Sequence, residues 1–94
     1  MIVSFKCKET EKIFNRVFST KLPQAIQIIA FRKLRMLNRA FSVNDLRVPP
    51  GNHLEILSGK LKGLYSIRIN SQWRICFEWE NGNVQSVEIV DYHK

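Results

Sequence analysis

The stretch LYSIRINSQWRICFEW, residues 64–79, decides the fold of this chain. Two runs of alternating apolar and polar residues flank the polar triplet Asn70-Ser71-Gln72. Within each run the apolar side chains occupy every second position, as they do in a strand with one buried face. The stretch therefore predicts a β-hairpin with a tight connection at the triplet. Its inward-facing residues would be Tyr65, Ile67, Ile69, Ile75, Phe77 and Trp79.

The apolar pattern also predicts the register of this hairpin. If the apolar residues of both runs share the buried face, Ile67 pairs with Ile75, and Arg68 stands opposite Arg74 on the open face. Like charges directly across a strand pair destabilise it by up to roughly 1 kcal/mol. A bound anion would reverse the sign of that interaction. We therefore predict that the open face of the hairpin binds phosphate.

The remaining segments predict an α+β fold, with two helices on one face of a small, mainly antiparallel sheet. The turn dipeptide Asn81-Gly82 separates the hairpin from a last strand. No repeat or linker divides the chain, so residues 1–94 are expected to form a single domain. The expected elements are a strand over 2–5, helices over 9–18 and from Pro23 to about Asn38, and strands over 53–57 and 83–90.

The charge of the chain is strongly positive and unevenly placed. Its 94 residues carry a net charge of +7. No acidic residue occurs between Glu11 and Asp45, or between Glu55 and Glu78, although Lys and Arg occur throughout both intervals. This pattern favours a nucleic acid, an acidic protein or an anionic membrane surface as a partner. We interpret the basic residues of the second helix itself as a solvated surface.

Several functional classes lack their signatures in this sequence. Cys7 and Cys76 have no spacing that would hold zinc and are expected to be reduced. The chain has no glycine-rich nucleotide loop, serine elbow or pair of catalytic carboxylates. No apolar run approaches the ~18 residues of a membrane span. We expect a cytoplasmic protein that needs no cofactor or metal and does not contact a membrane.

The chain end brings titratable groups to the edge of the predicted sheet. These are Asp91, Tyr92 and His93. Histidine transfers protons near neutral pH, and the planar donors of arginine fit phosphate. Such groups suffice for metal-independent RNA cleavage, in which a ribose 2′-hydroxyl attacks the neighbouring phosphate. A histidine this close to the chain end is also common as a solvated residue, so the residues alone leave both roles open.

The sequence PPGNHLEILSGKLKGLYSIRINSQWRICFEW, residues 49–79, followed by VEIVDYH, residues 87–93, resembles the HigB-type toxins. These form the plasmid maintenance system killer family of the RelE/ParE superfamily. The start MIVSFKCKETEKIF, residues 1–14, is also similar to this family. The resemblance implies a RelE-like fold and a type II toxin that cleaves mRNA in the ribosomal A site. It also implies a HigA-like helix-turn-helix antitoxin, which would neutralise the toxin and repress the shared operon together with it.

The resemblance assigns roles at the chain end and in the hairpin. Asp91, Tyr92 and His93 match the active-site triplet of the family, and Arg74 matches its phosphate-binding arginine. We predict that Arg74 and Arg68 clamp phosphate, and that His93 and Asp91 transfer or orient protons. Tyr92 would position the substrate, either by stacking on a base or by orienting the scissile phosphate.

The turn before the hairpin is predicted to add electrostatic contacts to RNA through Lys60 and Lys62. Some HigB-type toxins have a His and a Lys in this region. Alignment on LEILSGKLKGLYSI, residues 54–67, places Glu55 and Ser58 at those positions, with His53 nearby but offset. The set of proton-transfer groups therefore departs from the pattern of those relatives.

Two other functional classes compete with an RNA-cleaving toxin. A ParE-like toxin would act without catalysis by binding DNA gyrase, and its basic surface would then contact protein. A repressor or RNA-binding accessory protein is the third possibility, but the sequence has no recognisable helix-turn-helix. The Asp91-Tyr92-His93 triplet and Arg74 favour the enzyme.

Overall fold

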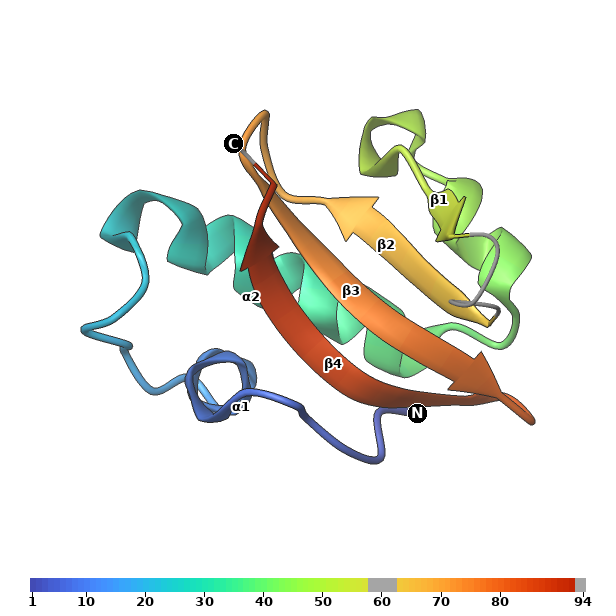
Figure 1. The fold of residues 1–94 in the computed structure, drawn as a ribbon, viewed down its shortest axis with the longest axis horizontal. Coiled ribbons are helices and arrows are strands. Elements are labelled where there is room, and N and C mark those ends of the chain that lie inside the picture. The colour runs from blue at the N-terminus through green and yellow to red at the C-terminus, as the bar shows by residue number, and fades with distance from the viewer. Residues whose placement is uncertain (58–62, 93–94) are drawn as a thin grey trace.

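The computed structural model describes residues 1–57 and 63–92 of the chain, and every structural statement below refers to these residues. The strands form one antiparallel sheet in the order β1-β2-β3-β4. The helices and strands are α1 (Lys8–Phe14), α2 (Gln24–Arg39), β1 (Glu55–Leu57), β2 (Leu64–Arg68), β3 (Trp73–Glu80) and β4 (Asn83–Asp91). The short 3-10 helices η1 (Val43–Arg47) and η2 (Pro50–Asn52) connect α2 to β1 (Figure 1).

The hairpin formed by β2 and β3 has the predicted register. Ile67 pairs with Ile75, and Arg68 pairs with Arg74. Ile67, Ile75 and Phe77 are fully buried, as the alternation requires. The predicted hairpin and its register are therefore confirmed, but Ser66 and Arg74 on the opposite face are buried as well.

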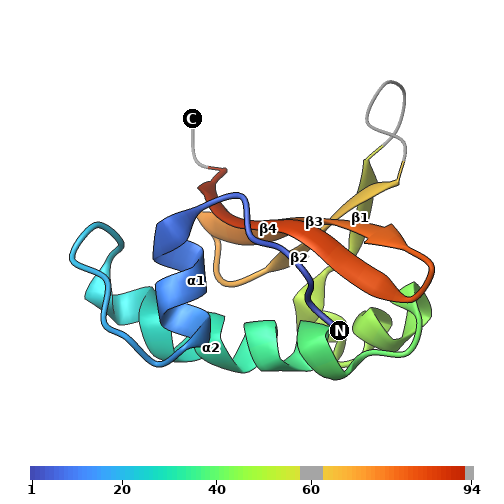
Figure 2. The ribbon, with the colours of Figure 1, turned by 90° about the horizontal axis from the view of Figure 1, so that it is seen from below.

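Helix α2 covers the inner face of the sheet, and α1 packs beside β4 (Figures 1 and 2). The opposite side of the sheet, here called the outer face, is not covered by either helix (Figure 2). Burial of each large apolar side chain in the core stabilises the fold by about 1.5–3 kcal/mol. The α+β architecture is thus confirmed. The fully buried apolar residues are Ala30, Leu34, Leu37, Leu46, Ile67, Ile75, Phe77, Val84 and Val87.

The N-terminal segment lies beside β4 but does not form the continuous strand that we expected. Ile2 and Val84 form one isolated parallel bridge, and Phe5 and Val87 form another. Between these bridges Ser86 has a φ of 54°, a left-handed backbone that departs from extended geometry. The departure distorts β4 locally without ending the strand, and the pairing with the N-terminal segment is limited to the two bridges.

Helix α1 is shorter than predicted. The helix expected over 9–18 ends at Phe14, and Arg16 has a φ of 63° that turns the chain away from the helix axis. Val17 and Phe18, which fit the apolar spacing of a longer helix, are 51% and 57% exposed. The predicted last turn of this helix is therefore wrong.

A buried glutamine of α2 explains why the chain leaves the helix early. The side-chain amide of Gln27 accepts a hydrogen bond from Ser19 N at 3.1 Å and donates to Ser19 O at 2.8 Å. It also donates to Leu22 O at 2.9 Å. These bonds satisfy the buried polar groups of the turn and hold it against α2. Along the described chain, no helix is both long enough and apolar enough to cross a membrane.

Candidate functional site

Arg74, the second residue of β3, is the centre of the candidate site. Its side chain lies on the outer face but is only 7% exposed. Nε donates to Ser66 Oγ at 2.8 Å, and Nη2 donates to Ser66 O at 3.2 Å. Nη2 also donates to the main-chain oxygen of His53. Within residues 1–57 and 63–92, the hydrogen bonds of the guanidinium are made by Nε and Nη2, and none is made by Nη1.

The burial of Arg74 corrects the sequence-based view of an arginine standing free on an open face. A guanidinium withdrawn from water needs hydrogen-bond partners, and Ser66 and His53 supply them. The resulting donor is fixed in position before any ligand arrives. A fixed donor loses less conformational freedom when it binds an anion than a solvated arginine does.

The backbone at His53 makes one of these contacts possible. His53 follows η2 with a φ of 43°, a left-handed conformation that is uncommon for a residue other than glycine. The adjacent Asn52 is fully buried and donates to Leu46 O at 3.0 Å. Its Oδ1 accepts a hydrogen bond from Lys33 of α2. Asn52 thus anchors the turn from which the His53 carbonyl reaches Arg74, while the imidazole of His53 is exposed.

Glu55 and Tyr92 flank the guanidinium of Arg74. Glu55 Oε1 lies 3.5 Å from Arg74 Nε, and the carboxylate side chain is 52% exposed. The Tyr92 ring lies with its centroid 5.6 Å from Arg74 Cζ, which is a cation–π arrangement. Burial raises the pKa of the Tyr92 hydroxyl, and the adjacent Cys76 thiol adds to the increase. The Tyr92 hydroxyl is therefore protonated at neutral pH.

The end of β4 is attached to the β2–β3 connection. Gln72 Nε2 donates to Asp91 Oδ2 at 3.2 Å, and Tyr92 N donates to Gln72 O at 2.7 Å. Trp73 and Asp91 are also register partners, next to the pair formed by Arg74 and Val90. These contacts bring Asp91 and Tyr92 to the Arg74 end of the sheet, as the sequence predicted. The other predicted site residues His93, Lys60 and Lys62 lie outside the described residues.

Arg68 is the register partner of Arg74 but has a different environment. The residue is half-buried, and it takes part in none of the ion pairs found in the described part of the chain. Burial lowers the pKa of Lys33 on α2, and the positive charge of Arg68 lowers it further. The positive charge of Arg68 therefore acts on a group of α2 as well as on the hairpin.

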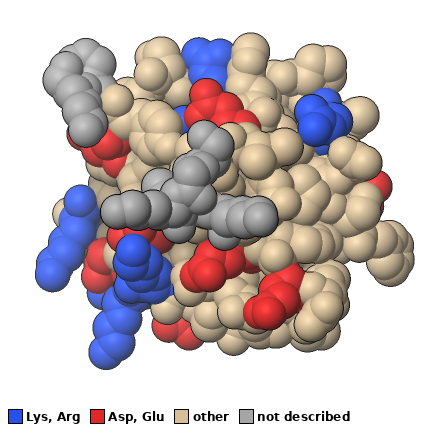
Figure 3. Space-filling view, turned by 45° about the vertical axis from the view of Figure 1, so that its right-hand side comes forward, with Lys and Arg blue, Asp and Glu red and all other residues tan. Residues whose placement is uncertain are grey.

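The outer face has carboxylates as well as arginines. Glu78 is the partner of Leu64, and Glu88 is the partner of Cys76, so both share the face of Arg74. Figure 3 shows acidic and basic residues side by side on part of this surface. The described residues contain no group of three His, Cys, Asp or Glu that could hold a metal ion. Cys7 and Cys76 are both free thiols.

Glu55 was not among the predicted site residues, although the alignment with HigB-type toxins singled out its position. It is the register partner of Ser66, the residue that holds Arg74. Pairing the predicted strand over 53–57 with the hairpin in this register would have placed the carboxylate beside the arginine. The sequence alone does not fix that register, because the strand is short and Leu57 breaks the alternation of Leu54 and Ile56.

The sheet and the helix pair behind it have the fold of solved α+β structures. YoeB in the heterotetrameric YoeB–YefM toxin–antitoxin complex from Staphylococcus aureus superposes with a TM-score of 0.61 at 21% identity, covering 100% of this chain and 97% of that one. YafQ from E. coli superposes with a TM-score of 0.60 at 11% identity, covering 97% and 91%. These similarities establish the shared fold.

The sequence comparisons establish the family. The model of the RelE-like toxin of type II toxin–antitoxin system HigB matches residues 3–93, and the chain belongs to this family. Toxin HigB-1 of Vibrio cholerae is 42% identical over 100% of this chain and 99% of its own length. Endoribonuclease HigB of Proteus vulgaris is 31% identical over 99% of this chain and 100% of its own length. The resemblance inferred from the sequence is confirmed.

Proposed function

We propose that this chain is a ribosome-dependent mRNA endoribonuclease that stops translation as the toxin of a type II toxin–antitoxin system. The observation that carries the proposal is the position of Arg74, fixed by Ser66 and His53 with Nη1 left over. Tyr92 and Glu55 stand beside it on the same face. Membership of the HigB family and the activity in the name of the Proteus vulgaris relative support this assignment.

The proposed reaction needs no metal. The ribose 2′-hydroxyl attacks the adjacent phosphorus, the bond to the 5′-oxygen breaks, and the products are a 2′,3′-cyclic phosphate and a 5′-hydroxyl. One group removes the proton of the 2′-hydroxyl and another protonates the leaving oxygen. Negative charge increases on the phosphate oxygens in the transition state. A cation that is already in place stabilises this charge without further reorganisation.

Each residue has a specific part in this scheme. Arg74 would hold the scissile phosphate through Nη1, and Arg68 would add positive charge on the same hairpin. His93 and Asp91 would transfer or orient protons. Tyr92, protonated at neutral pH, would position the phosphate or stack on a base.

Two further groups complete the proposed site. Glu55 is a second candidate for accepting the 2′-hydroxyl proton, because its carboxylate is half-exposed and lies 3.5 Å from Arg74 Nε. Lys60 and Lys62 would contact the backbone of mRNA or ribosomal RNA.

An antitoxin partner follows from membership of a toxin–antitoxin family. We propose that this partner is HigA-like, with a helix-turn-helix, and that its complex with this chain represses the operon encoding both. We place the protein in the cytoplasm, where translating ribosomes are found. Gyrase inhibition, the competing sequence-based hypothesis, receives no support from the relatives named above.

Primer extension on a reporter mRNA in a reconstituted translation system tests the proposal. The wild type should cut at codon positions only when ribosomes translate the message, and His93→Ala should abolish the cuts. Matched reactions without ribosomes provide the control. If translation stops without cuts in the message and DNA supercoiling is inhibited, the enzyme hypothesis is wrong and the chain is a gyrase-binding toxin.

A further inference from the structure

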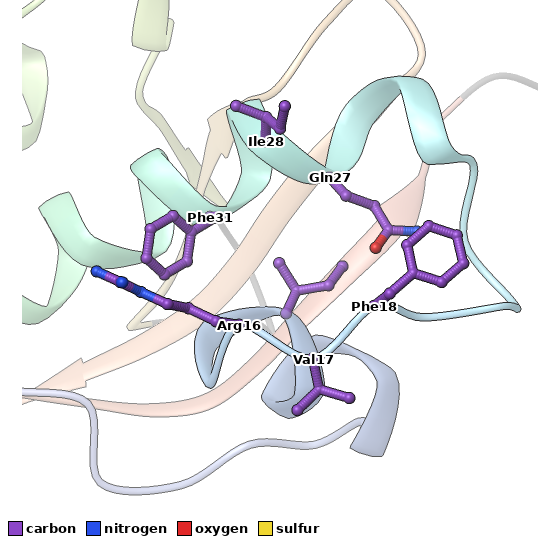
Figure 4. Close-up of a pocket in the computed structure, with 7 residues that line it drawn as sticks. Arg16, Val17, Phe18, Gln27, Ile28 and Phe31 are labelled. Atoms are coloured by element: carbon purple, nitrogen blue, oxygen red, sulfur yellow. The ribbon is translucent and has the colours of Figure 1, made fainter.

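The helix side of the molecule has a hollow that the proposed cleavage does not use. It has a volume of about 520 Å³ and lies between α2 and the segment that follows α1 (Figure 4). Figures 1 and 2 place these two elements away from the outer face of the sheet. The residues that line the hollow are Ile13, Arg16, Val17, Phe18, Gln27, Ile28 and Phe31.

One end of this hollow is unusually apolar for a surface. Val17 is 51%, Phe18 57% and Ile28 67% exposed, and all three line the same space. Large apolar side chains that gather on the surface of a small protein commonly mark an interaction site. These apolar side chains lie together because α1 ends early. A longer helix would not present Val17 and Phe18 in this loop.

The other end is cationic. A second hollow of about 220 Å³ shares Arg16 and Phe31 with the first and is also lined by Arg35 and Arg39. Arg16 Cζ lies 5.1 Å and Arg35 Cζ 5.8 Å from the centroid of the Phe31 ring. The Phe31 ring thus joins the apolar end to the cationic end. We call the two hollows together the α1–α2 groove.

The cations of the α1–α2 groove have no acidic counterparts in the structure. No Asp or Glu lines either hollow. Among the residues described, Arg16, Arg35 and Arg39 form no ion pair with a carboxylate. In contrast to the mixed outer face, this side therefore combines exposed apolar groups with unpaired positive charge.

We propose that the α1–α2 groove binds an acidic segment of a partner protein. Apolar side chains of that segment would cover Phe18 and Ile28, and its Asp or Glu residues would lie against Arg16, Arg35 and Arg39. Carboxylates match the paired donors of arginine, and burial of the apolar end supplies the driving force for association. A base of RNA could stack on Phe18, but the aliphatic Val17 and Ile28 offer no aromatic face for stacking, so protein is the better fit.

The groove is already shaped for such a ligand. The bonds from Gln27 to Ser19 and Leu22 hold the segment after α1 in place. In Figure 4, Phe18 lies beside Gln27 and Arg16 lies beside Phe31. A preformed groove reduces the ordering that binding requires. The inference does not rest on RNA cleavage, because no residue of the groove belongs to the proposed catalytic site.

A randomised peptide library displayed on phage, panned against the purified full chain, tests the inference. Enriched peptides should combine apolar residues with Asp or Glu. Their synthetic forms should bind at least about tenfold more weakly to the double variant F18S/I28S, and also to R16E/R35E. Phe41→Ser is the matched control, because Phe41 is 92% exposed outside the groove. This variant should bind the peptides as the wild type does.

Several results would overturn the inference. Enriched peptides that lack acidic residues, or that bind the groove variants as well as the wild type, would exclude the proposed ligand. A dimer seen by analytical ultracentrifugation and lost in F18S/I28S would assign the groove to a second copy of this chain. Binding of a single-stranded RNA oligonucleotide that is lost in R16E/R35E but retained in F18S/I28S would assign it to RNA. Circular dichroism and message cleavage, both expected to be unchanged, show that each variant folds.

Discussion

The outer face of the sheet and the α1–α2 groove both present arginines, but they hold them in different ways. Arg74 is 7% exposed and gives its donors to Ser66 and His53. Arg16 and Arg35 lie against the Phe31 ring without an acidic partner in the described chain. The first arrangement fixes the Arg74 guanidinium beside other reactive groups, which suits catalysis. The second leaves charge and apolar surface accessible, which suits docking.

This difference shows that net charge is a poor guide to the catalytic surface. The chain carries +7, yet the outer face mixes Glu55, Glu78 and Glu88 with its arginines. The interval without acidic residues from Glu11 to Asp45 contributes instead to the helix side. Fixation of one arginine, more than the number of arginines, distinguishes the candidate catalytic face.

Replacement of Arg74 should have the largest effect. Arg74→Lys keeps the charge but loses the fork that bonds Ser66 and His53, so we expect message cleavage to fall by about 100-fold or more. Arg74→Ala should in addition lower the free energy of unfolding by about 2–3 kcal/mol, because it leaves main-chain acceptors without partners. Primer extension measures the first effect and urea denaturation the second. Arg39→Ala, an exposed arginine of the groove, is the control and should cleave normally.

Replacement of Tyr92 should have the next largest effect and should separate its two possible roles. Tyr92→Ala removes both ring and hydroxyl, and we expect cleavage to fall by about 10- to 100-fold. If the hydroxyl orients the phosphate, Tyr92→Phe will be nearly as slow as Tyr92→Ala. If the ring stacks on a base, Tyr92→Phe will be close to the wild type. Equal rates for all three proteins would remove Tyr92 from the site.

The pH dependence of cleavage tests the protonation state assigned to Tyr92. Because the folded protein raises the pKa of Tyr92, its hydroxyl stays protonated at neutral pH and up to its ordinary value near 10. A loss of activity over this range that disappears in Tyr92→Phe would contradict the assigned environment. The measurement is the single-turnover cleavage rate as a function of pH for the two proteins.

Replacement of Gln27 should affect stability and leave cleavage unchanged. Its buried amide makes three hydrogen bonds to the turn after α1, so Gln27→Ala should lower the free energy of unfolding by about 1–3 kcal/mol. Gln24→Ala, at an exposed position of the same helix, is the matched control. Unfolding in urea measures both variants. A large loss of cleavage in folded Gln27→Ala would show that the two surfaces are coupled.

The smallest effect is expected at Asp45, in the connection between helices and sheet. Backbone N–H groups of Phe41 and Ser42 donate to its carboxylate and lower its pKa. A lowered carboxyl pKa contributes stability above the unfolded value, and that stability is lost as pH falls through the folded value. Asp45→Asn should therefore unfold at less urea than the wild type at neutral pH, and at equal urea once both are strongly acidified. Glu80→Gln, in an exposed position, should match the wild type at both pH values.

The sequence was sufficient for the hairpin, because its information is local. Alternation within 64–79 correctly predicts the burial of Ile67, Ile69, Ile75 and Phe77 and pairs Ile67 with Ile75, although it misses the burial of Ser66 and Arg74. The family resemblance, carried by the hairpin and the chain end, is confirmed by the match over residues 3–93. The roles of Arg74, Arg68, Asp91 and Tyr92 stay predictions, as do those of His93, Lys60 and Lys62.

The sequence was insufficient where a distant partner decides the local structure. Val17 and Phe18 fit a helical pattern, but Gln27 binds the turn at Ser19 and α1 ends early. For this reason the α1–α2 groove could not be foreseen. Similarly, the burial of Arg74 depends on the His53 carbonyl and on the left-handed backbone of His53. Because this residue is not a glycine, the sequence gives no sign of that conformation.

The most direct test of the account compares message cleavage by three proteins in one reconstituted translation system: the wild type, Tyr92→Ala and F18S/I28S. The account predicts that the groove variant cuts at the wild-type rate and positions, whereas Tyr92→Ala is at least about tenfold slower. Normal cutting by Tyr92→Ala, with loss of cutting in folded F18S/I28S, would contradict the assignment of chemistry to the outer face.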